Sequence, residues 1–433
     1  GETIQGKMLN FEDWQKLSSK NGEGMYMFPY LDAFMGIVYD HDLFVENGWL
    51  AFADASDKEA LTAQHIVFEE RTEYGTTGLY FVSSEGKTNY ESGDRILKAG
   101  RDETFGTYDD GQPETEAEFD AMISEICNGG EDAYSFLYNG VHDHYLNAVG
   151  HAVMAQYMGE AQFRAALAYD SDGAPVKMHD GGEKVIDFET NGFEVIRSEG
   201  SYQALRFMDK YFNSADVHPD GKKTSSFTHT DAQNTFLVEM NKAAVRDGTG
   251  YPAMLVDGMW WENEASAMFD SIGKSNPARG WGKVDFRFMC LPKVSGQYGI
   301  DGNGSGTFFT SFDNGGIVVP KQADAAKLAA IKDFLAMTVT DEVLRSFTVS
   351  TGISRPFACD LSDEELSRMT PFARNSWEIS RDTENVRIMR FSILRNMEPI
   401  TFASDMEDSF IYLENNGVYS QSYIRALRES GGG

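Results

Sequence analysis

Two adjacent tryptophans, Trp260 and Trp261, are the most informative side chains for chemistry. They follow Gly258 and an apolar strand pattern, and Glu262 comes directly after them. Flat indole rings stack on the apolar C–H faces of sugar rings, while carboxylates and amides hydrogen-bond to the hydroxyl groups. Neighbouring residues on an extended or turning backbone face different ways, so we expect one ring to line a cleft. The competing interpretation places both rings in the core, because tryptophan is highly buried on average.

A second aromatic and polar cluster lies in residues 134–145. It holds Tyr138, His142, Asp143 and Tyr145, and we interpret it as a glycine-containing loop between two helices. Binding residues concentrate on loops that a rigid scaffold positions, so these four side chains are predicted to contact a ligand. The alternative is an exposed aromatic loop that binds nothing.

The sequence lacks the short motifs of common catalytic sites. It contains no GxSxG, no HExxH, no Walker-A glycine loop and no GxGxxG after a strand. We therefore predict no catalytic residues and no enzyme activity. Carboxylates are so abundant that some pair will always have the separation that glycosidases use, so a glycoside-active enzyme stays open as an alternative.

Metal and cofactor signals are weak. Residues 170–173 and 301–305 have the oxygen-donor spacing of calcium loops, but no glutamate completes an EF-hand. His142 and His144 could reach a metal ion, yet no third ligand lies nearby. We predict neither a metal nor a cofactor. Three widely separated cysteines fit buried thiols rather than disulfides or a zinc site: Cys127, Cys290 and Cys359.

Helical and extended patterns alternate along most of the chain. Thr115 and Glu118 form a capping box before apolar residues at helical spacing, which predicts a helix over 116–127. Ser362 and Glu365 form a second one, at the start of a mostly helical C-terminal region. Further helices are expected at 142–168, 201–213, 230–242, 323–337 and 340–349, and strands at 253–256, 286–291 and 316–319. The pattern is typical of an α/β protein, with a small inserted sheet over 50–110.

Length and charge limit the possible functions. The chain has 433 residues, which predicts two lobes, and its 37 basic and 68 acidic side chains give a net charge of −31. Such a charge repels nucleic acids and anionic lipids, and it favours a neutral or cationic ligand. No apolar stretch reaches the length of about 20 residues that a membrane-spanning helix needs.

Four segments in order resemble the family-1 extracellular solute-binding proteins, the maltose-binding-protein-like subunits of bacterial ABC importers. They are residues 27–48, with MFPY, GIVYDHDLF and a closing glycine; 106–113, GTYDDGQP; 253–261, AMLVDGMWW; and 315–353, with GGIVVP, TDEV and TGI. Asp40 and His41 stand where the family has Asn and Lys. The GTYDDG block is similar to carbohydrate-binding members from Gram-positive Firmicutes.

The resemblance implies a two-lobe, type II periplasmic-binding-protein-like fold with crossing hinge strands. A sugar or oligosaccharide would bind between the lobes and be delivered to the transmembrane subunits of an ABC permease by a monomer without chemistry of its own. The protein would be an extracellular lipoprotein tethered to the outer face of the cytoplasmic membrane. The residues that the resemblance places near the ligand or the hinges are Trp260, Trp261, Tyr138, Tyr30, Gly315 and Arg355.

One departure from the family pattern concerns the first lobe. Members begin with a strand–helix–strand block, whereas here the hinge motif is reached by residue 39, so we expect an N-terminal lobe that lacks much of this block. Residues 1–36 and 312–352 are assigned to its remnant. Residues 37–311 and 353–433 are assigned to the C-terminal lobe. A surface polysaccharide-binding module is a further alternative to the importer subunit.

Overall fold

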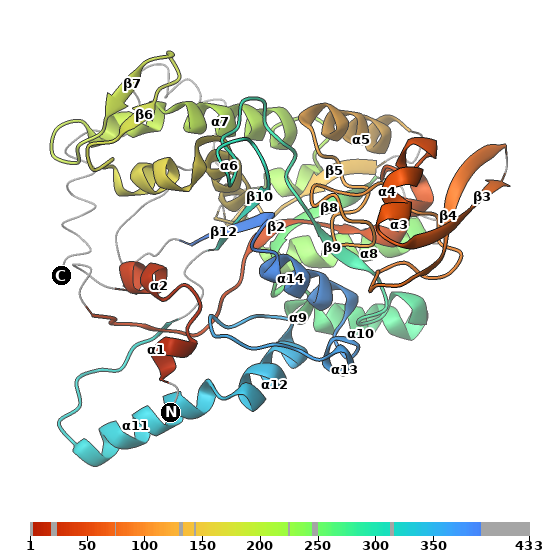
Figure 1. The fold of residues 1–433 in the computed structure, drawn as a ribbon. Helices are drawn as coiled ribbons and strands as arrows, with labels where there is room; N and C mark the ends of the chain where they lie inside the picture. The colour runs from red at the N-terminus through yellow and green to blue at the C-terminus, as the bar shows by residue number, and fades with distance from the viewer. Residues whose placement is uncertain are drawn as a thin grey trace.

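A computed structural model describes residues 3–18, 24–73, 75–129, 133–142, 144–223, 226–244, 250–311 and 316–390. The fold is α/β, as the sequence predicted (Figure 1). Its helices are α1 (Ile4–Lys7), α2 (Phe11–Ser18), α3 (His41–Asn47), α4 (Lys58–Ala63), α5 (Glu116–Asn128), α6 (His144–Ala168), α7 (Glu199–Phe212), α8 (His229–Ala244), α9 (Trp261–Glu264), α10 (Ser266–Ser275), α11 (Ala325–Thr338), α12 (Asp341–Thr351), α13 (Asp363–Leu366) and α14 (Pro371–Arg381). Its strands are β1 (Phe28–Pro29), β2 (Met35–Asp40), β3 (Ile66–Glu73), β4 (Thr76–Ser84), β5 (Ala133–Leu137), β6 (Pro175–Lys177), β7 (Glu183–Val185), β8 (Tyr251–Gly258), β9 (Phe286–Met289), β10 (Thr307–Ser311), β11 (Gly316–Ile317) and β12 (Val386–Arg390).

A central sheet organises the molecule, with strand order β12-β10-β2-β8-β5 and β9 also paired to β2. β2 and β8 are buried along their whole length, as expected of apolar strands covered on both faces. β5, β8, β10 and β12 run in one direction and β2 runs in the other. The last residues of those four strands therefore meet the first residue of β2 at one end of the sheet, here called the Trp260 end. Asp40 and Phe286 pair at the opposite end, here called the Asp40 end.

Helices cover the sheet and carry most of the apolar core. α6 packs against β2, β8 and β10, α8 packs against β8, and α14 packs against β9. α6 confirms the long helix expected over 142–168, but its direction breaks at Gly159, where φ is +74°. A Cβ at that position would lie 2.4 Å from the ring of Tyr298, so both the backbone angle and the space require glycine.

Residues 50–110 form an insertion that contains the small sheet predicted from the sequence, and they also have a small apolar core of their own. β3 and β4 pair along their length as a hairpin, which extends to the right in Figure 1. The short helix α4 packs against β3. Leu61, Ile96 and Phe105 are buried in this separate cluster.

Two expectations about local structure need correction. The segment expected to be a loop between two helices begins as a strand, because Tyr134 to Leu137 belong to β5, and the loop joins β5 to α6. The C-terminal region is helical through α14, but β12 follows and pairs in parallel with β10. The sequence VRIMR of β12 places Val386 and Met389 in the core, and so short a run carries little periodicity to distinguish a strand from a helix.

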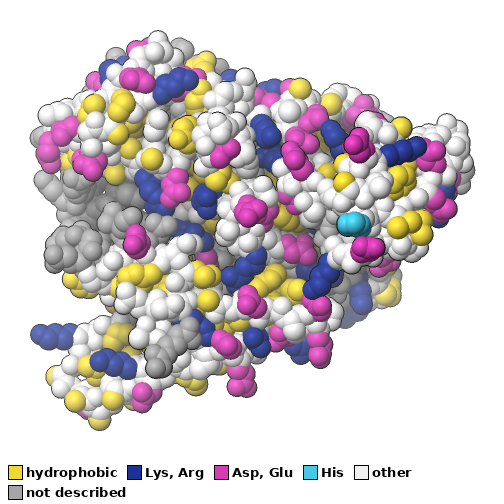
Figure 2. Space-filling model, in the orientation of Figure 1, with side chains coloured by type: hydrophobic (Ala, Val, Ile, Leu, Met, Phe, Trp, Pro, Cys, Tyr) yellow, Lys and Arg dark blue, Asp and Glu magenta, His cyan; other side chains and the backbone are white. Residues whose placement is uncertain are grey.

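The segments assigned to an N-terminal lobe do pack on one another. β1 pairs with β11, Lys7 forms an ion pair with Asp341, and Trp14 and Leu344 share a small core. α11 lies on the outside of this group, at the lower left of Figure 1. Phe334 on α11 is 56% exposed, and Figure 2 shows apolar side chains among charged ones on this part of the surface. The division into two lobes stays a prediction.

Candidate ligand-binding site

Trp260 and Tyr145 meet at the Trp260 end of the sheet. β5 and β8 are parallel neighbours, so the segments that follow them leave the sheet side by side. One leads to Tyr145 in the first turn of α6 and the other to Trp260 before α9. The indole Nε1 of Trp260 donates a hydrogen bond to the Tyr145 hydroxyl over 3.2 Å. The rings meet edge to face with centroids 6.1 Å apart, so each fixes the orientation of the other.

Histidines extend this pair into a larger aromatic cluster. The ring of His229, at the start of α8, stacks in parallel with Tyr145 at 6.4 Å and lies 5.5 Å from His142. His144 lies 4.6 Å from Tyr145. The backbone N–H of His142 donates to the Asn139 side chain over 2.8 Å, which holds the loop closed before α6. Asp143, predicted to belong to this group, lies outside the described residues.

A buried polar network lies beneath the rings of the aromatic cluster. Gln233 on α8 donates to Asp257 over 3.0 Å and to Glu264 over 2.9 Å. Asp257 also accepts from the N–H of Gly258, and its burial raises the pKa of its carboxyl to about 8. Burial and the neighbouring Asp257 raise the pKa of the Tyr145 hydroxyl, so that hydroxyl stays protonated and accepts from Trp260. The network joins α8, β8 and α9 beneath the rings.

The two adjacent tryptophans lie in different surroundings. Trp260 is half-buried, whereas Trp261 is 0% exposed and packs against Phe236, Phe286 and Phe372. The chain turns at this point, because β8 ends at Gly258 and α9 begins at Trp261. We therefore assign Trp261 a place in the core and leave it out of the ligand-contacting group.

Two more of the predicted ligand residues are buried beside this cluster. The Tyr138 hydroxyl donates to the carbonyl of Phe212 over 3.1 Å, so its polar end is bound inside the protein. Glu262 is buried and accepts a hydrogen bond from Thr370 over 2.6 Å. Burial raises the pKa of the Glu262 carboxyl to about 7. Both side chains hold neighbouring elements in place.

Tyr30 and Arg355 form a separate pair near β1. The guanidinium of Arg355 lies over the Tyr30 ring, 4.7 Å from its centroid, and its Nε donates to the Tyr30 carbonyl over 3.0 Å. Arg355 also donates to the carbonyl of Thr338, so its donors join β1, α11 and the segment after α12. Gly315, predicted to lie near a hinge crossing, is outside the described residues.

Solved structures similar to this chain are solute-binding proteins. A probable secreted solute-binding lipoprotein from Streptomyces coelicolor is 11% identical, with a TM-score of 0.49 over 99% of this chain and 76% of that one. A Streptococcus pneumoniae solute-binding protein in complex with the blood group A-trisaccharide is 14% identical, with a TM-score of 0.45 over 96% and 74%. RafE in complex with raffinose is 14% identical, with a TM-score of 0.44 over 98% and 79%.

These structures belong to the class that the four sequence segments resemble. No protein-family model matches the chain, and no curated protein matches it. Since every one of the three TM-scores is below 0.5, we argue the function from the residues of this chain.

Sequence reasoning missed His229, Gln233 and Asp257. The sequence could have indicated Asp257, because it is a carboxylate at the end of an otherwise apolar strand and stands three residues before Trp260. His229 and Gln233 carried none, since they lie in a helix whose neighbours in space come from other parts of the chain. Among the described residues, no three His, Cys, Asp or Glu side chains are grouped so that they could hold a metal ion. Within the same residues, every helix is too short or too polar to cross a membrane.

Proposed function

We propose that this chain is the carbohydrate-binding subunit of an ABC importer. In this proposal the Trp260 ring stacks on a sugar ring at the Trp260 end of the sheet, within a cleft between two lobes. The observation that carries it is the half-buried Trp260 ring, which Tyr145 holds by a hydrogen bond and an edge-to-face contact. A fixed aromatic face beside polar groups suits a ring with one apolar face and many hydroxyls, because little side-chain freedom is lost on binding.

The position in the fold also supports a binding site. In sheets with parallel strands, ligands bind beyond the carboxyl ends of the strands, and β5 and β8 both end beside Trp260. Asn139 Nδ2 and Gln233 Oε1, from the loop before α6 and from α8, are buried without a hydrogen-bond partner among the described residues. Because both side chains are buried, ordered water is the partner that would satisfy these atoms.

The buried carboxylates near Trp260 argue against glycoside hydrolysis at this site. Asp257 has the raised pKa that suits a general acid, but it is 1% exposed and its oxygens accept from Gly258 and Gln233. A general acid must reach the glycosidic oxygen of the substrate. We propose binding without turnover, by a monomer on the outer face of the cytoplasmic membrane that passes its ligand to permease subunits.

Isothermal titration with raffinose, stachyose and chitin oligosaccharides tests this function. These sugars are chosen because the solved structures similar to this chain include a raffinose complex, a stachyose complex and a chitin oligosaccharide binding protein. We expect at least one to bind, and Trp260→Ala to weaken that binding by about tenfold or more, equal to 1.4 kcal/mol. Trp260→Phe keeps an aromatic face and serves as the matched control, with most of the affinity retained.

Two results would contradict the proposal. Equal affinity in the wild type and Trp260→Ala would remove the stacking role of the indole. Steady release of product from chromogenic glycosides, in place of stoichiometric binding, would favour the glycoside-active alternative.

A further inference from the structure

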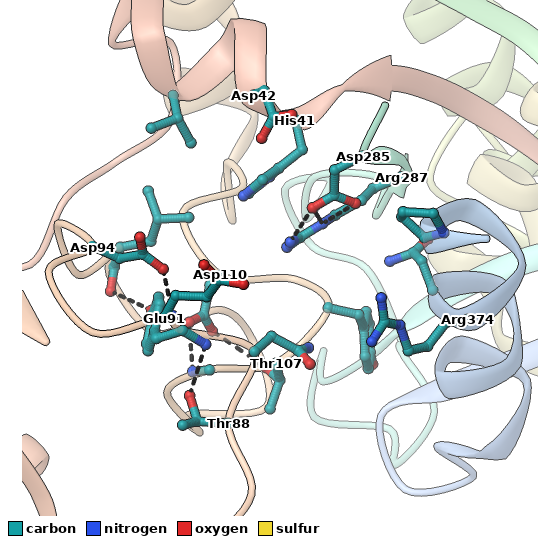
Figure 3. A pocket seen from close by; sticks show the side chains of 18 of the residues that line it. His41, Asp42, Thr88, Glu91, Asp94, Thr107, Asp110, Asp285, Arg287 and Arg374 are labelled. Carbon is teal, nitrogen blue, oxygen red and sulfur yellow. Dashed lines mark hydrogen bonds and ion pairs between the residues drawn. The ribbon is translucent and has the colours of Figure 1, made fainter. Parts of the chain in front are cut away.

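A large polar cavity lies at the Asp40 end of the sheet, away from the aromatic cluster. Its volume is about 770 Å³, within the range of small-molecule sites. The first turn of α3, the insertion around residues 88–110, the start of β9 and helix α14 all contribute to its walls (Figure 3). None of the residues predicted from the sequence to bind a ligand lines it.

Charged side chains of both signs line the cavity. Arg374 projects from α14 on one side, next to the ion pair of Arg287 and Asp285. Glu91 and Asp94 of the insertion lie on the other side in Figure 3. The guanidinium of Arg374 makes no ion pair within 4.0 Å among the described residues. Arg374 interacts electrostatically with Asp285 and Glu378 on its own side of the cavity. It also faces the carboxylates of the insertion across open space.

One buried group on the walls has a polar atom without a partner, and a second buried group extends into the cavity. Asn375 is 4% exposed, and its Oδ1 accepts from the N–H of Phe288 over 2.9 Å, which fixes the amide. Its Nδ2 has no hydrogen-bond partner in the described part of the chain. His41 is 8% exposed, and its Nδ1 lies 3.5 Å from the Tyr39 hydroxyl while the ring extends into the cavity in Figure 3. Leaving buried polar atoms without partners costs about 1–3 kcal/mol each, so such atoms indicate a missing ligand or water.

The charges of the lining decide which ligands it suits. Seven carboxylates and three guanidiniums line the cavity, so a dianion is disfavoured. Burial, with Asp285 as the largest charged contribution, raises the pKa of the Asp42 carboxyl to about 6. An ammonium group near Asp42 would offset this repulsion. A diamine would leave the donors of Arg374 and of the Asn375 amide without an acceptor from the ligand.

We propose that this cavity binds a small zwitterionic solute of the amino-acid type, with its carboxylate at Arg374 and the Asn375 amide and its ammonium at Asp42 and Glu91. Arg374 can donate two parallel hydrogen bonds to a carboxylate, and such pairs are strong and directional. The carboxylates of Asp42 and Glu91 have no hydrogen-bond donor or ion-pair partner among the described residues, so both can accept from an ammonium. This site shares no residue with the aromatic cluster and does not depend on sugar binding.

Calorimetric titration and thermal shift with the twenty free L-amino acids and glycylglycine test the proposal. We expect at least one of them to bind. Arg374→Gln should weaken its binding by about tenfold or more, because a charge-assisted pair is lost. Arg368→Gln, at an exposed arginine outside the cavity, is the matched control and should change nothing. The double variant Asp42→Asn with Glu91→Gln tests the opposite wall without touching α14 and should also weaken binding.

Three outcomes would overturn the proposal. The first is the absence of binding by every amino acid at millimolar concentration. The second is binding of 1,4-diaminobutane, succinate or raffinose in place of the zwitterions, with loss of that binding in the Arg374 variant. The third is amino-acid binding that neither variant weakens although circular dichroism shows both to be folded. Raffinose binding by the Arg374 variant and amino-acid binding by Trp260→Ala separate this proposal from the sugar site.

Discussion

At the scale of single residues, two neighbouring side chains of one type take different roles because the backbone turns between them. The sequence predicted that Trp260 and Trp261 would face different ways, but it could not tell which one enters the core. That depends on where β8 ends and α9 begins, and on three phenylalanines that come from distant parts of the chain. The role of Tyr138 could not be predicted from the sequence either. Its aromatic loop suggested contact with a ligand, whereas its hydroxyl donates a hydrogen bond inside the protein.

Gly258 sets the position of the Trp260 ring, and replacing it tests that geometry without removing the indole. A Cβ at residue 258 would lie 2.5 Å from Trp260 Cη2, so Gly258→Ala must push the ring aside. We expect weaker sugar binding and a changed tryptophan emission spectrum. Gly86→Ala is the matched control, because a Cβ there meets nothing within 4 Å. Unchanged affinity and emission in Gly258→Ala would mean that the ring position is set elsewhere.

Glu262 should make stability depend on pH. Its pKa is raised from 4.5 to about 7 in the folded protein, chiefly by burial. Between these pH values the folded state holds more protons than the unfolded state, so the free energy of unfolding falls as pH rises, by up to about 1.4 kcal/mol per pH unit. Glu262→Gln keeps an acceptor for Thr370 and removes the titration. We therefore expect urea unfolding between pH 5 and 7 to show a shallower decline in this variant.

The exposed Glu364 supplies a control for the pH experiment. Glu364→Gln removes one exposed carboxyl and leaves Glu262 and Thr370 in place, so it is the matched control and should retain the wild-type slope. Parallel slopes for wild type and Glu262→Gln would contradict a buried, protonated Glu262.

At the scale of elements, local signals predicted the helices well and the strands less well. The capping boxes at Thr115 and Ser362 are both present, with each hydroxyl accepting from the N–H three residues later and the glutamate reaching back. Such signals work because the interacting groups lie within four residues of one another. Local signals could not predict β12, because its partner β10 is far away in the sequence. The paired residues Thr307 and Val386 are 79 positions apart. The sequence did not predict His229 and Gln233 as site residues for the same reason.

The cap of α5 offers a direct measure of one local signal. The Thr115 hydroxyl accepts from the N–H of Glu118 over 3.3 Å, while the Glu118 carboxylate accepts from the N–H of Thr115 over 2.9 Å. Thr115→Ala should lower the free energy of unfolding by about 1 kcal/mol, because it removes the acceptor at the helix start. Thr115→Ser keeps the hydroxyl and should lose much less. Equal stability of the two variants in urea unfolding would show that solvent replaces the cap.

At the scale of the whole molecule, we propose a binding site at each end of the sheet, and only one of the two ends could be predicted from the sequence. The Trp260 end could be predicted from the sequence, because its aromatic residues cluster in short segments. The cavity at the Asp40 end was invisible, because its walls join His41, Glu91 and Arg374, three positions that only the folded chain brings together. The net charge of −31 predicted a neutral or cationic ligand, but it could not reveal that one cavity sets a cation opposite carboxylates.

The two ends share strand β2, and this raises the question of whether ligands at one end affect the other. β2 spans six residues, or roughly 20 Å, between Met35 and Asp40 and is buried along its length between paired strands. A strand that is buried and paired along its length is a poor two-state element for a ligand to shift. We therefore expect the two sites to act independently. The dissociation constant of raffinose should change by less than about twofold when the cavity is saturated with its amino acid, and the reverse titration must give the same factor by linkage. A change of tenfold or more in both titrations would instead mean that β2 or the helices on it adopt two arrangements, and that binding at one end selects between them.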